Sequence, residues 1–260
     1  MDKSKREFIK GGFATLVAAG TSANAFTLQN PGRDAKDSRY IGNKLKQYSM
    51  IIDLRQCVGC QACTSACMVE NSVPNGQNRT FVTEMEIGEF PNVRKSFLPQ
   101  LCNHCDDPAC VPVCPTGATF KREDGIVVVD SEVCWGCGYC ENACPYDKRF
   151  MNKETKVIDK CTFCAHRVDE GLLPACVETC VGGARIFGDL KDKNSEISKL
   201  LANFPTTVLK NEQGTKPQVF YIGLDGRVEN LLNATVSLDD MMREVIGLKP
   251  KEWATQRGDK

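Results

Sequence analysis

The spacing of the cysteines is the feature that most constrains this chain. All sixteen fall into four groups of four, and none is left over. In chain order the groups are Cys57, Cys60, Cys63, Cys67; Cys102, Cys105, Cys110, Cys114; Cys134, Cys137, Cys140, Cys144; and Cys161, Cys164, Cys176, Cys180. The first and third groups have the C-x2-C-x2-C-x3-C spacing that holds cubane iron–sulfur clusters in bacterial ferredoxins. At four thiolates per cubane, the sequence predicts four [4Fe–4S] clusters and therefore a protein that conducts electrons.

Two other uses of these cysteines fit the pattern less well. Disulfide frameworks belong to small secreted domains that lack a core, whereas this chain has 260 residues, of which 42% are hydrophobic. Structural zinc takes two separated C-x2-C pairs, in which a further cysteine three residues on has no role. Cys114-Pro115 and Cys144-Pro145 also reproduce the Cys-Pro ending of the ferredoxin run. The spacing therefore favours iron–sulfur clusters over zinc or disulfides.

The chain also contains an internal duplication. Residues 53–67 align with residues 130–144, so the first and third groups are copies of one unit. Residues 108–118 align with residues 174–184 in the same way, which relates the second and fourth groups. The order a, b, a′, b′ predicts two ferredoxin-like modules of two clusters each.

Each module needs two cysteine runs that exchange their last thiolate, because in a two-cluster ferredoxin the fourth cysteine of a run binds the other cluster. The Cys-Pro ending is shared by the second and third runs and absent from the first and fourth. We therefore expect an inner module from runs two and three, and an outer module from runs one and four. The expected ligand sets, numbered 1 to 4, are Cys57/Cys60/Cys63/Cys180, Cys161/Cys164/Cys176/Cys67, Cys102/Cys105/Cys110/Cys144 and Cys134/Cys137/Cys140/Cys114.

The rest of the sequence predicts an α+β chain with β-hairpin insertions and much irregular coil. Apolar β-branched runs at 50–52 and 126–129 are typical of short strands, and hairpins are expected over 81–98 and over 119–129. Amphipathic helices are expected after Ser195, with Ile197, Leu200, Leu201 and Phe204 on one face, and over 238–246. The expected organisation is a leader at 1–25, a linker at 26–45, the outer module at 46–98 and 158–190, the inner module at 99–157 and a C-terminal extension at 191–260.

The N-terminus is similar to a twin-arginine export signal. Residues 4–10 read Ser-Lys-Arg-Glu-Phe-Ile-Lys, with Lys5 in place of the first arginine, and a mildly apolar stretch leads to the small-x-small site Ala23-Asn24-Ala25. An ordinary secretory signal and an amphipathic tail are the alternatives. Free thiols exported unfolded would be oxidised in the periplasm, which favours export of the folded protein and cleavage after Ala25. The apolar stretch is too short to span a bilayer, so we expect a periplasmic protein held at the membrane by a partner subunit.

Charge and motifs exclude other ligands. Thirty-three basic residues balance thirty-three acidic residues, which argues against nucleic acid as a partner. No G-x-G-x-x-G or other glycine-rich phosphate loop follows a strand, so we expect no nucleotide or flavin. Five basic residues near the cysteine runs are candidates for hydrogen bonds to sulfur that tune the reduction potentials, with plain surface solvation as the alternative. They are His104, His166, Arg167, Arg185 and Lys160.

Two stretches carry a family resemblance together with the order of the four groups: residues 101–110, Leu-Cys-Asn-His-Cys-Asp-Asp-Pro-Ala-Cys, and residues 159–164, Asp-Lys-Cys-Thr-Phe-Cys. Over residues 46–225 the chain resembles the iron–sulfur (beta) subunits of the complex molybdenum oxidoreductases of anaerobic respiration. Within that family it most resembles the beta subunits of tetrathionate reductases. The stretches that carry this second likeness are residues 60–63, 118–130, 175–185 and 219–224.

The resemblance implies a non-catalytic electron-transfer subunit. It would carry four [4Fe–4S] clusters between a quinol-oxidising integral membrane subunit and a molybdopterin catalytic subunit. Some nitrate reductase relatives place a tryptophan where Cys137 stands here, so all four clusters are expected to be cubanes. The beta subunits of polysulfide/thiosulfate and arsenate reductases are near alternatives. A carrier that serves a multihaem cytochrome nitrite reductase is a second class of function.

The resemblance also implies a direction. Set 1 would face the catalytic subunit, and set 4 would face the membrane subunit. The third run contains Trp135 and Tyr139, where the first run has Val58 and Ala62. Aromatic residues with a polar tip are favoured at interfaces, although packing over the cluster is an alternative use of both.

Overall fold

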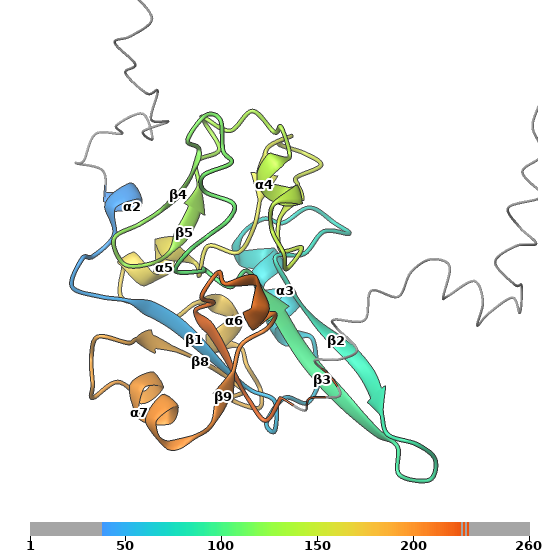
Figure 1. Cartoon of the computed structure of the whole chain (residues 1–260). Helices are drawn as coiled ribbons and strands as arrows, with labels where there is room; N and C mark the ends of the chain where they lie inside the picture. The colour runs from blue at the N-terminus through green and yellow to red at the C-terminus, as the bar shows by residue number, and fades with distance from the viewer. Residues whose placement is uncertain (1–37, 225, 227, 229–260) are drawn as a thin grey trace, which may run out of the picture.

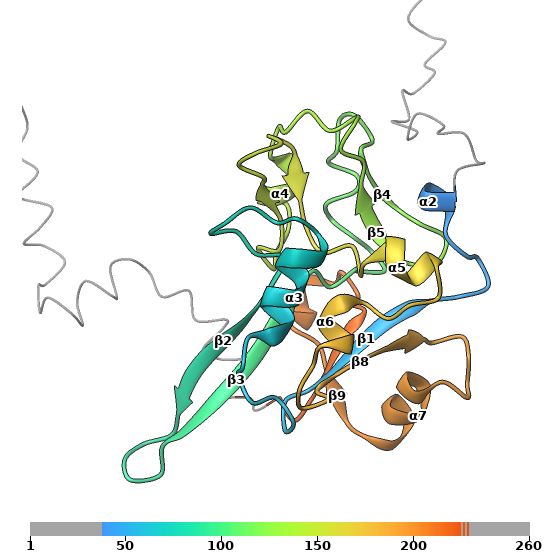
Figure 2. The same cartoon turned by 180° about the vertical axis from the view of Figure 1, so that it is seen from behind.

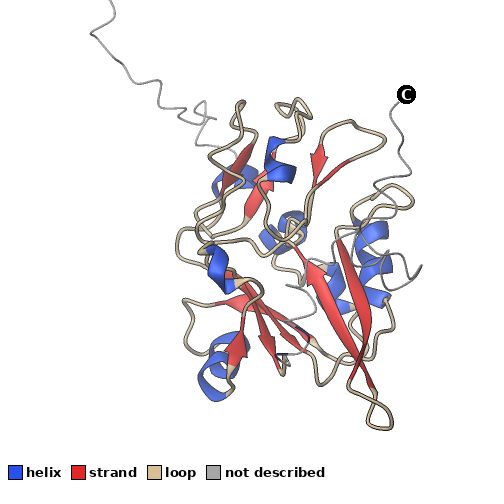
Figure 3. Cartoon of the chain, turned by 45° about the vertical axis from the view of Figure 1, so that its right-hand side comes forward, coloured by secondary structure: helices blue, strands red, loops and turns tan. Residues whose placement is uncertain are grey.

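The computed structural model describes residues 38–224, 226 and 228 and has an α+β fold (Figure 1). Short helices, short strands and long loops alternate along these residues, and loops make up much of the chain (Figure 3). The expected fold class is therefore confirmed at the level of an α+β chain with hairpins and irregular coil. The expected leader at 1–25 and the expected helix at 238–246 lie outside the described residues.

The largest sheet is built around the strand that precedes the first cysteine run. Its order is β8 (Arg185–Asp189), β1 (Tyr48–Asp53), β10 (Val219–Ile222) and β9 (Thr206–Thr207), with β1 parallel to β10 and antiparallel to β8. All six residues of β1 are buried, as expected for the central strand of a sheet covered on both faces. The predicted strand at 50–52 is confirmed, and it runs directly into the loop that begins the first run.

Helix α7 (Glu196–Asn203) covers one face of this sheet, where Ile51, Ile197 and Ile222 form a buried cluster. The side chain of Ser195 caps the helix by accepting a hydrogen bond from the backbone N–H of Ser198 at 3.3 Å. The predicted helix is confirmed except at its end. Phe204 is extended with ψ 140° and lies after the last helical residue.

The predicted hairpin at 81–98 is also confirmed and is longer than expected. Strands β2 (Thr80–Ile87) and β3 (Arg94–Leu101) pair in antiparallel register. The hairpin projects from the body of the molecule in both views (Figure 2). Leu98 and Leu101 at its base are buried, whereas Phe90 at its turn is 93% exposed. The base therefore packs on the cysteine runs, and the tip points into solvent.

A second part of the chain lies above the four-stranded sheet in the view of Figure 1. It contains the predicted hairpin of β4 (Thr119–Lys121) and β5 (Val127–Val129), which turns at Asp124-Gly125. The Asp124 carboxylate accepts hydrogen bonds from Ile126 N at 3.2 Å and from Arg122 Nη2 at 2.8 Å. A further small hairpin, β6 (Phe150–Met151) with β7 (Ile158–Asp159), was not expected from the sequence.

The remaining helices are short. They are α2 (Ser38–Ile41), α3 (Ala62–Glu70), α4 (Tyr139–Asn142), α5 (Ala165–Asp169), α6 (Ala175–Glu178) and the 3-10 helix η1 (Asn211–Gln213). Of these, α3, α4 and α6 contain cysteines. Within the part of the chain that the structure describes, no helix is both long enough and apolar enough to cross a membrane.

Candidate iron–sulfur sites

The first and third cysteine runs fold as a loop followed by a helix. In the first run, Gln61 has a positive φ of 59° and α3 begins at the next residue, so Cys57 and Cys60 lie on the loop and Cys63 and Cys67 on the helix. The third run has the same form, because Gly138 has φ 76° and α4 begins at Tyr139. Cys63 and Cys67, four residues apart on α3, lie on one face of the helix and are both buried, whereas Cys144 lies beyond the end of α4. The duplicated sequence therefore folds into duplicated local structure.

All sixteen thiols are free of disulfide bonds, and they differ in burial. Cys60 in the first run and Cys137 at the equivalent position of the third run are exposed. Eight thiols are buried: Cys63, Cys67, Cys102, Cys110, Cys140, Cys161, Cys164 and Cys176. The other six are partly buried: Cys57, Cys105, Cys114, Cys134, Cys144 and Cys180.

The thiols of set 1 surround one cavity. Its walls include Cys57, Cys60 and Cys63 from the first run and Cys180 from the fourth run. The two runs approach closely, because a Cβ atom added at Gly182 would lie 2.2 Å from the carbonyl oxygen of Gln56. The fold thus brings the last cysteine of run four to the first three cysteines of run one.

The thiols expected in set 2 interact with one another in the interior. Burial raises the pKa of Cys67 to about 12, and the neighbouring thiols of Cys176 and Cys164 contribute to this rise. Burial also raises the pKa of Cys161 well above its usual value, with smaller contributions from Cys67 and Cys176. Cys67 therefore lies among the first three cysteines of run four, although it belongs to run one.

Set 3 shows the same exchange between the second and third runs. Burial raises the pKa of Cys105 to about 12, with smaller contributions from Cys102, Cys110 and Cys144. Cys144 is the last cysteine of run three, and the other three belong to run two. Asn103, next to Cys102, is buried, and both its side-chain Nδ2 and its Oδ1 lack a hydrogen-bond partner among the described residues. The sulfide of a bound cluster would supply an acceptor at this position.

In set 4, Cys140 belongs to a small buried cluster with Val127, Ile158 and Cys110 of set 3, and the partly buried Cys134 packs against it. The backbone N–H of Ile158 lies 3.5 Å from Cys134 Sγ. Cys114 accepts a hydrogen bond from Thr119 N at 3.4 Å. Although burial acts to raise the pKa of Cys114, hydrogen bonds from Thr119 and Thr116 outweigh it and place that pKa below its usual value.

These arrangements suit a cluster better than a single ion. In the described part of the chain, no three His, Cys, Asp or Glu side chains converge to hold one metal ion. A cubane has four irons, each of which takes one thiolate, so its ligands surround a volume rather than meet at a point. Four free thiols around one cavity match that requirement.

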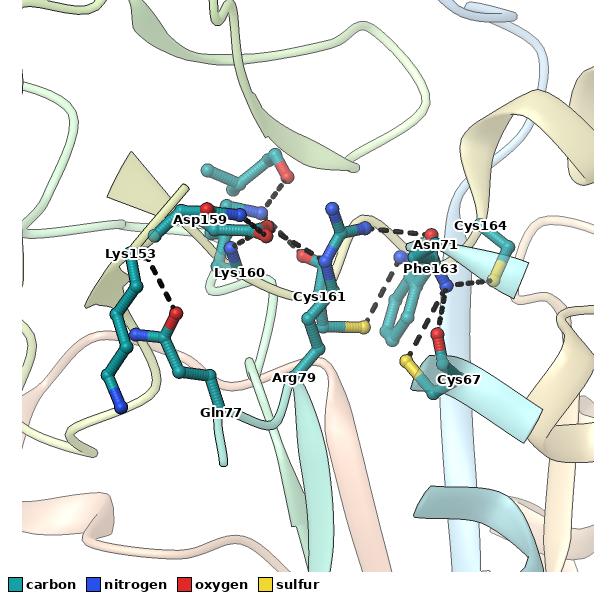
Figure 4. A network of polar contacts seen from close by, with 12 residues as sticks. Cys67, Asn71, Gln77, Arg79, Lys153, Asp159, Lys160, Cys161, Phe163 and Cys164 are labelled. Atoms are coloured by element: carbon teal, nitrogen blue, oxygen red, sulfur yellow. Dashed lines mark hydrogen bonds and ion pairs between the residues drawn. The ribbon is translucent and has the colours of Figure 1, made fainter. Parts of the chain in front are cut away.

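A polar network connects set 2 to the small β6–β7 hairpin (Figure 4). Asn71 Nδ2 lies 3.5 Å from Cys67 Sγ and 3.8 Å from Cys164 Sγ. Arg79 orients this amide, because its Nη1 donates to Asn71 Oδ1 at 2.7 Å while its Nε pairs with Asp159 Oδ1 at 2.8 Å. The network therefore holds the Asn71 amide as a hydrogen-bond donor to Cys67 and Cys164, which belong to different runs.

Two buried arginines also donate to cysteine sulfurs. Arg185 Nη1 lies 3.7 Å from Cys176 Sγ, as expected from its position after the fourth run. Arg149 Nη2 lies 2.8 Å from Cys110 Sγ, and this contact was not expected. The only sequence signal for Arg149 is a basic residue five positions after the last cysteine of run three.

The other expected donors do not contact sulfur. His104 is buried, stacks on Phe163 with 3.7 Å between ring centroids, and accepts a hydrogen bond from Val127 N at its Nδ1. Burial lowers the pKa of His104 well below its usual value. His166 and Arg167 instead bind the carboxylate of Glu70 at 2.8 Å and 2.9 Å. The expectation of sulfur contacts was wrong for His166 and Arg167, because the Glu70 carboxylate is their nearer partner. His104 Nε2 is buried without a hydrogen-bond partner among the described residues, so a contact of this nitrogen with sulfur stays a prediction.

Lys160 also differs from the expectation. Its ammonium is buried and donates to the carbonyl oxygens of Val127 and Cys161 rather than to sulfur. Burial lowers the pKa of Lys160, against an opposing contribution from Cys102.

Apolar side chains surround both exposed cysteines. Trp135 is 80% exposed and Tyr139 is 61% exposed, on either side of Cys137. Val58, close to Cys60, is 60% exposed, and Val181, which follows Cys180, is 76% exposed. Neither aromatic ring is therefore buried by packing on the interior. The surfaces near Cys60 and near Cys137 both contain exposed apolar side chains.

Comparison with known proteins gives consistent results. Residues 93–190, which contain runs two, three and four, match the model of the 4Fe-4S dicluster domain. The chain is 51% identical over 229 residues to the beta subunit of tetrathionate reductase of Salmonella typhimurium, covering 86% of this chain and 90% of the relative. It is 42% identical over 225 residues to protein NrfC of Escherichia coli, covering 85% and 96%. It is 41% identical over 209 residues to the beta subunit of selenate reductase of Mesobacillus selenatarsenatis, covering 68% and 72%.

Proposed function

The chain belongs to the family of iron–sulfur (beta) subunits of complex molybdenum oxidoreductases, and from this premise we propose that it carries four [4Fe–4S] clusters between two partner subunits. As a member of this family it is a non-catalytic electron-transfer subunit that binds [4Fe–4S] clusters. Such clusters accept and release single electrons at potentials set by charge, hydrogen bonds to sulfur and exposure.

We propose sets 1 to 4 as the ligands of the four clusters. The single observation that carries this is the cavity of set 1, which is lined by three cysteines of run one and the last cysteine of run four. The mutual electrostatic effects of the thiols in sets 2 and 3 support the same exchange. Runs one and four would then form the outer module at 46–98 and 158–190, and runs two and three the inner module at 99–157.

The contacts between sets support a linear order. Arg185 lines the cavity of set 1 and lies 3.7 Å from Cys176 Sγ of set 2. Cys161 of set 2 interacts electrostatically with Cys102 of set 3. Arg149 interacts with Cys110 of set 3 and with Cys140 of set 4. Electrons would therefore pass through the sets in the order 4, 3, 2, 1 or its reverse.

The chain's own residues hold and insulate this path. The thiolates fix the irons, and buried apolar side chains such as Leu98, Leu101 and Phe163 exclude water between the sets. Asn71 and the backbone N–H of Phe163 donate to sulfurs of set 2. No proton donor or nucleophile is required, because an electron carrier makes and breaks no bond in its substrate.

Two partners complete the proposal. A quinol-oxidising integral membrane subunit would deliver electrons at set 4, and a molybdopterin catalytic subunit would take them at set 1. The exposed Cys137 with Trp135 and Tyr139, and the exposed Cys60 with Val58, support contact surfaces at these two ends. We assign the complex to tetrathionate reduction on the 51% identity to the beta subunit of a tetrathionate reductase.

Polysulfide/thiosulfate and arsenate reductases remain alternatives for the complex. Purifying the chain with its partners and assaying tetrathionate, thiosulfate and arsenate with a reduced dye tests the assignment. Turnover of tetrathionate above the other two supports it, and turnover of another acceptor alone replaces it.

The 42% identity to protein NrfC, over 96% of that relative, favours one second candidate. In it, the chain carries electrons to a multihaem cytochrome nitrite reductase, and no molybdenum subunit is present. The same purification decides between the two candidates, since it recovers either molybdopterin or haem with this chain.

We place the protein in the periplasm, exported after folding. The support is the sequence of residues 4–10 and the chemistry of cluster assembly before export. Arg6→Gln is expected to leave a cluster-loaded protein in the cytoplasm. Unchanged delivery to the periplasm of this variant would assign export to a signal on a partner.

Metal analysis tests the cluster count. The full-length protein, reconstituted without oxygen, is expected to contain about sixteen iron and sixteen sulfide per chain, four of each per cubane. About twelve iron or fewer, or stoichiometric zinc, would overturn the four-cluster proposal.

A further inference from the structure

Three buried cations stand apart from all other charged residues near the cysteines. Arg149, Lys160 and Arg185 are 4%, 1% and 3% exposed. None of them forms an ion pair with a carboxylate among the described residues, whereas the equally buried Arg122 pairs with Asp124 and Asp169. A buried charge without a counter-ion is costly, so the three cations require negative charge from another source.

Arg185 lies between sets 1 and 2. It forms part of the wall of the cavity that Cys57, Cys60, Cys63 and Cys180 surround. Its Nη1 lies 3.7 Å from Cys176 Sγ, and it interacts electrostatically with Cys63 of set 1 and with Cys176 and Cys161 of set 2. The guanidinium therefore faces one thiolate set on each side.

Arg149 has the same position between sets 3 and 4. Its Nη2 lies 2.8 Å from Cys110 Sγ of set 3. It interacts electrostatically with Cys102 and Cys144 of the same set and also with Cys140 of set 4.

Lys160 lies between sets 2 and 3. It is adjacent in sequence to Cys161 of set 2, and its ammonium donates to the Cys161 carbonyl oxygen at 2.7 Å. It interacts electrostatically with Cys161 on one side and with Cys102 and Cys110 of set 3 on the other. Each gap between successive sets therefore holds one buried cation.

Each of the two arginines donates a hydrogen bond to a threonine hydroxyl, and the positions of arginine and threonine are swapped between the two modules. Arg149 Nη1 donates to Thr119 Oγ1 at 3.1 Å, and Arg185 Nη2 donates to Thr80 Oγ1 at 2.8 Å. In the duplication, Gly117-Ala118-Thr119 aligns with Gly183-Ala184-Arg185, so the arginine of one module stands where the other has threonine. Thr80 begins β2, which follows run one, and Arg149 directly precedes β6, which follows run three.

The swapped positions indicate that the guanidinium is kept for its function and was not simply inherited in both copies. The two copies keep a guanidinium beside the third cysteine of the b-type run, Cys110 or Cys176, although it comes from the segment after the a-type run in one module and from the segment after the b-type run in the other. Inheritance of one residue from a common ancestor does not produce that pattern, whereas a requirement for positive charge at this point does.

We propose that Arg185, Lys160 and Arg149 are positioning cations, one for each gap in the electron path, that raise the reduction potentials of the clusters on both sides. This inference rests on the proposed four-cluster function. One electron leaves one cluster and enters the next, so the receiving side gains a negative charge. A fixed positive charge in a low-dielectric interior stabilises that charge strongly.

The inference predicts which potentials each cation controls. The clusters of sets 2 and 3 each adjoin two cations, and those of sets 1 and 4 each adjoin one. Arg185→Gln is expected to lower the potentials of sets 1 and 2, Lys160→Gln those of sets 2 and 3, and Arg149→Gln those of sets 3 and 4. Each affected potential is expected to fall by at least about 59 mV, the equivalent of a tenfold change in a one-electron equilibrium constant.

The experiment is a redox titration of the full-length reconstituted protein, followed by electron paramagnetic resonance. The two glutamine variants at arginine positions are expected to shift different pairs of the four potentials. Arg149→Lys and Arg185→Lys, which keep the charge, are expected to leave the potentials near those of the unaltered protein. Arg122→Gln is the matched control, because it removes an equally buried guanidinium that already has carboxylate partners.

An exchange variant keeps the test valid if a glutamine variant fails to fold. Thr119→Arg combined with Arg149→Thr moves the guanidinium to the strand that supplies it in the other module, and it is expected to retain all four potentials. Thr119→Val combined with Arg149→Met removes the charge and both polar partners, and it is expected to lower two of them.

The outcomes are distinct. Four clusters with two selectively lowered potentials in each charge-removing variant support the inference. Four clusters with unchanged potentials, with all four lowered equally, or with the same shift in Arg122→Gln overturn it while leaving the proposed function intact. Fewer than four clusters in the unaltered protein, by iron and sulfide analysis of the same sample, overturn the proposed function and the inference together.

Discussion

The ends of the cysteine array and its middle are built differently. Cys60 and Cys137, at equivalent positions in the first and third runs, are exposed and lie beside exposed apolar side chains. Cys102 and Cys161, in the second and fourth runs, are 8% and 6% exposed and belong to the main hydrophobic core. The second cysteine of each copy of one unit therefore lies at the surface, whereas the first cysteine of each copy of the other unit lies in the core.

Because of this difference, we expect the exposed cysteines at the ends and the buried cysteines in the middle to have different roles. An exposed end lets a partner approach the electron path, and the apolar surface around it suits a protein interface. In the middle, cysteines take part in the hydrophobic core, so we expect the fold there to depend on the proposed clusters. A ligand lost from the middle is expected to cost structure as well as iron, whereas a ligand lost at an end is expected to cost one site.

The strongest test of this difference compares Cys161→Ser with Cys60→Ser. Cys161→Ser places an unmatched hydroxyl in the core and removes a ligand of set 2, so we expect loss of more than half of the iron and at least a tenfold lower yield of soluble protein. Cys60→Ser is expected to lose at most one cluster, about four irons. Iron analysis and circular dichroism measure both, and equal losses would show that ends and middle do not differ.

The proposed exchange of ligands between runs predicts a smaller, selective loss of iron. Cys67→Ser is expected to disturb the cluster of Cys161, Cys164 and Cys176 and to spare that of Cys57, Cys60 and Cys63, because Cys67 interacts with Cys164 and Cys176. The spectrum of one cluster is expected to change while the other three persist. An anaerobic crystal structure in which Cys67 binds the cluster of its own run would contradict the exchange.

Glycines of the two exposed runs test how rigid each end is. A Cβ atom at Gly136 would lie 2.3 Å from the Lys156 carbonyl oxygen, whereas one at Gly59 would lie 2.4 Å from the movable ring of Phe97. Both glycines have positive φ, so alanine costs about 1–3 kcal/mol of stability at either position. We expect Gly136→Ala to lower the free energy of unfolding more than Gly59→Ala does, because a backbone carbonyl moves less readily than a side chain. Denaturant unfolding measures both losses.

Gly138→Ala is the control for this pair. Gly138 has φ 76°, and an added Cβ atom there would meet no atom within 4 Å. It should therefore report the backbone strain alone and give the smallest loss of the three. A larger loss for Gly138→Ala than for Gly136→Ala would mean that close packing does not limit this end.

The smallest structural effect is expected at the exposed aromatic residues of the third run. Trp135→Ala and Tyr139→Ala remove surface side chains, so we expect stability to change by no more than about 0.5 kcal/mol. In the assembled complex they are expected to slow quinol-linked reduction several-fold and to spare the dye-linked reaction. Val58→Ala, at the other end, is the matched variant and is expected to leave quinol-linked reduction of the clusters unchanged. Loss of the dye-linked reaction in the Trp135 and Tyr139 variants, with quinol-linked reduction intact, would reverse the direction of the path.

Local sequence was sufficient for much of this protein. The spacing of the cysteines predicts cubane clusters, and their repetition predicts two related units, because ligand geometry within a run depends on residues a few positions apart. The hairpins at β2–β3 and β4–β5 and the helix after Ser195 were predictable for the same reason. Turn residues, alternation and capping are all short-range signals.

Only the tertiary structure decided what lies between the runs. Arg149 reaches a cysteine 39 positions away, and Arg185 reaches a threonine 105 positions away. His104 stacks on Phe163 in the core and accepts a hydrogen bond from Val127 N, and nothing in its own run indicates either contact. The position of a buried cation depends on all the charged and packed groups around it, and these groups come from distant parts of the chain. The sequence therefore determined which chemistry the chain can hold, and the fold determined where charge and exposure act on it.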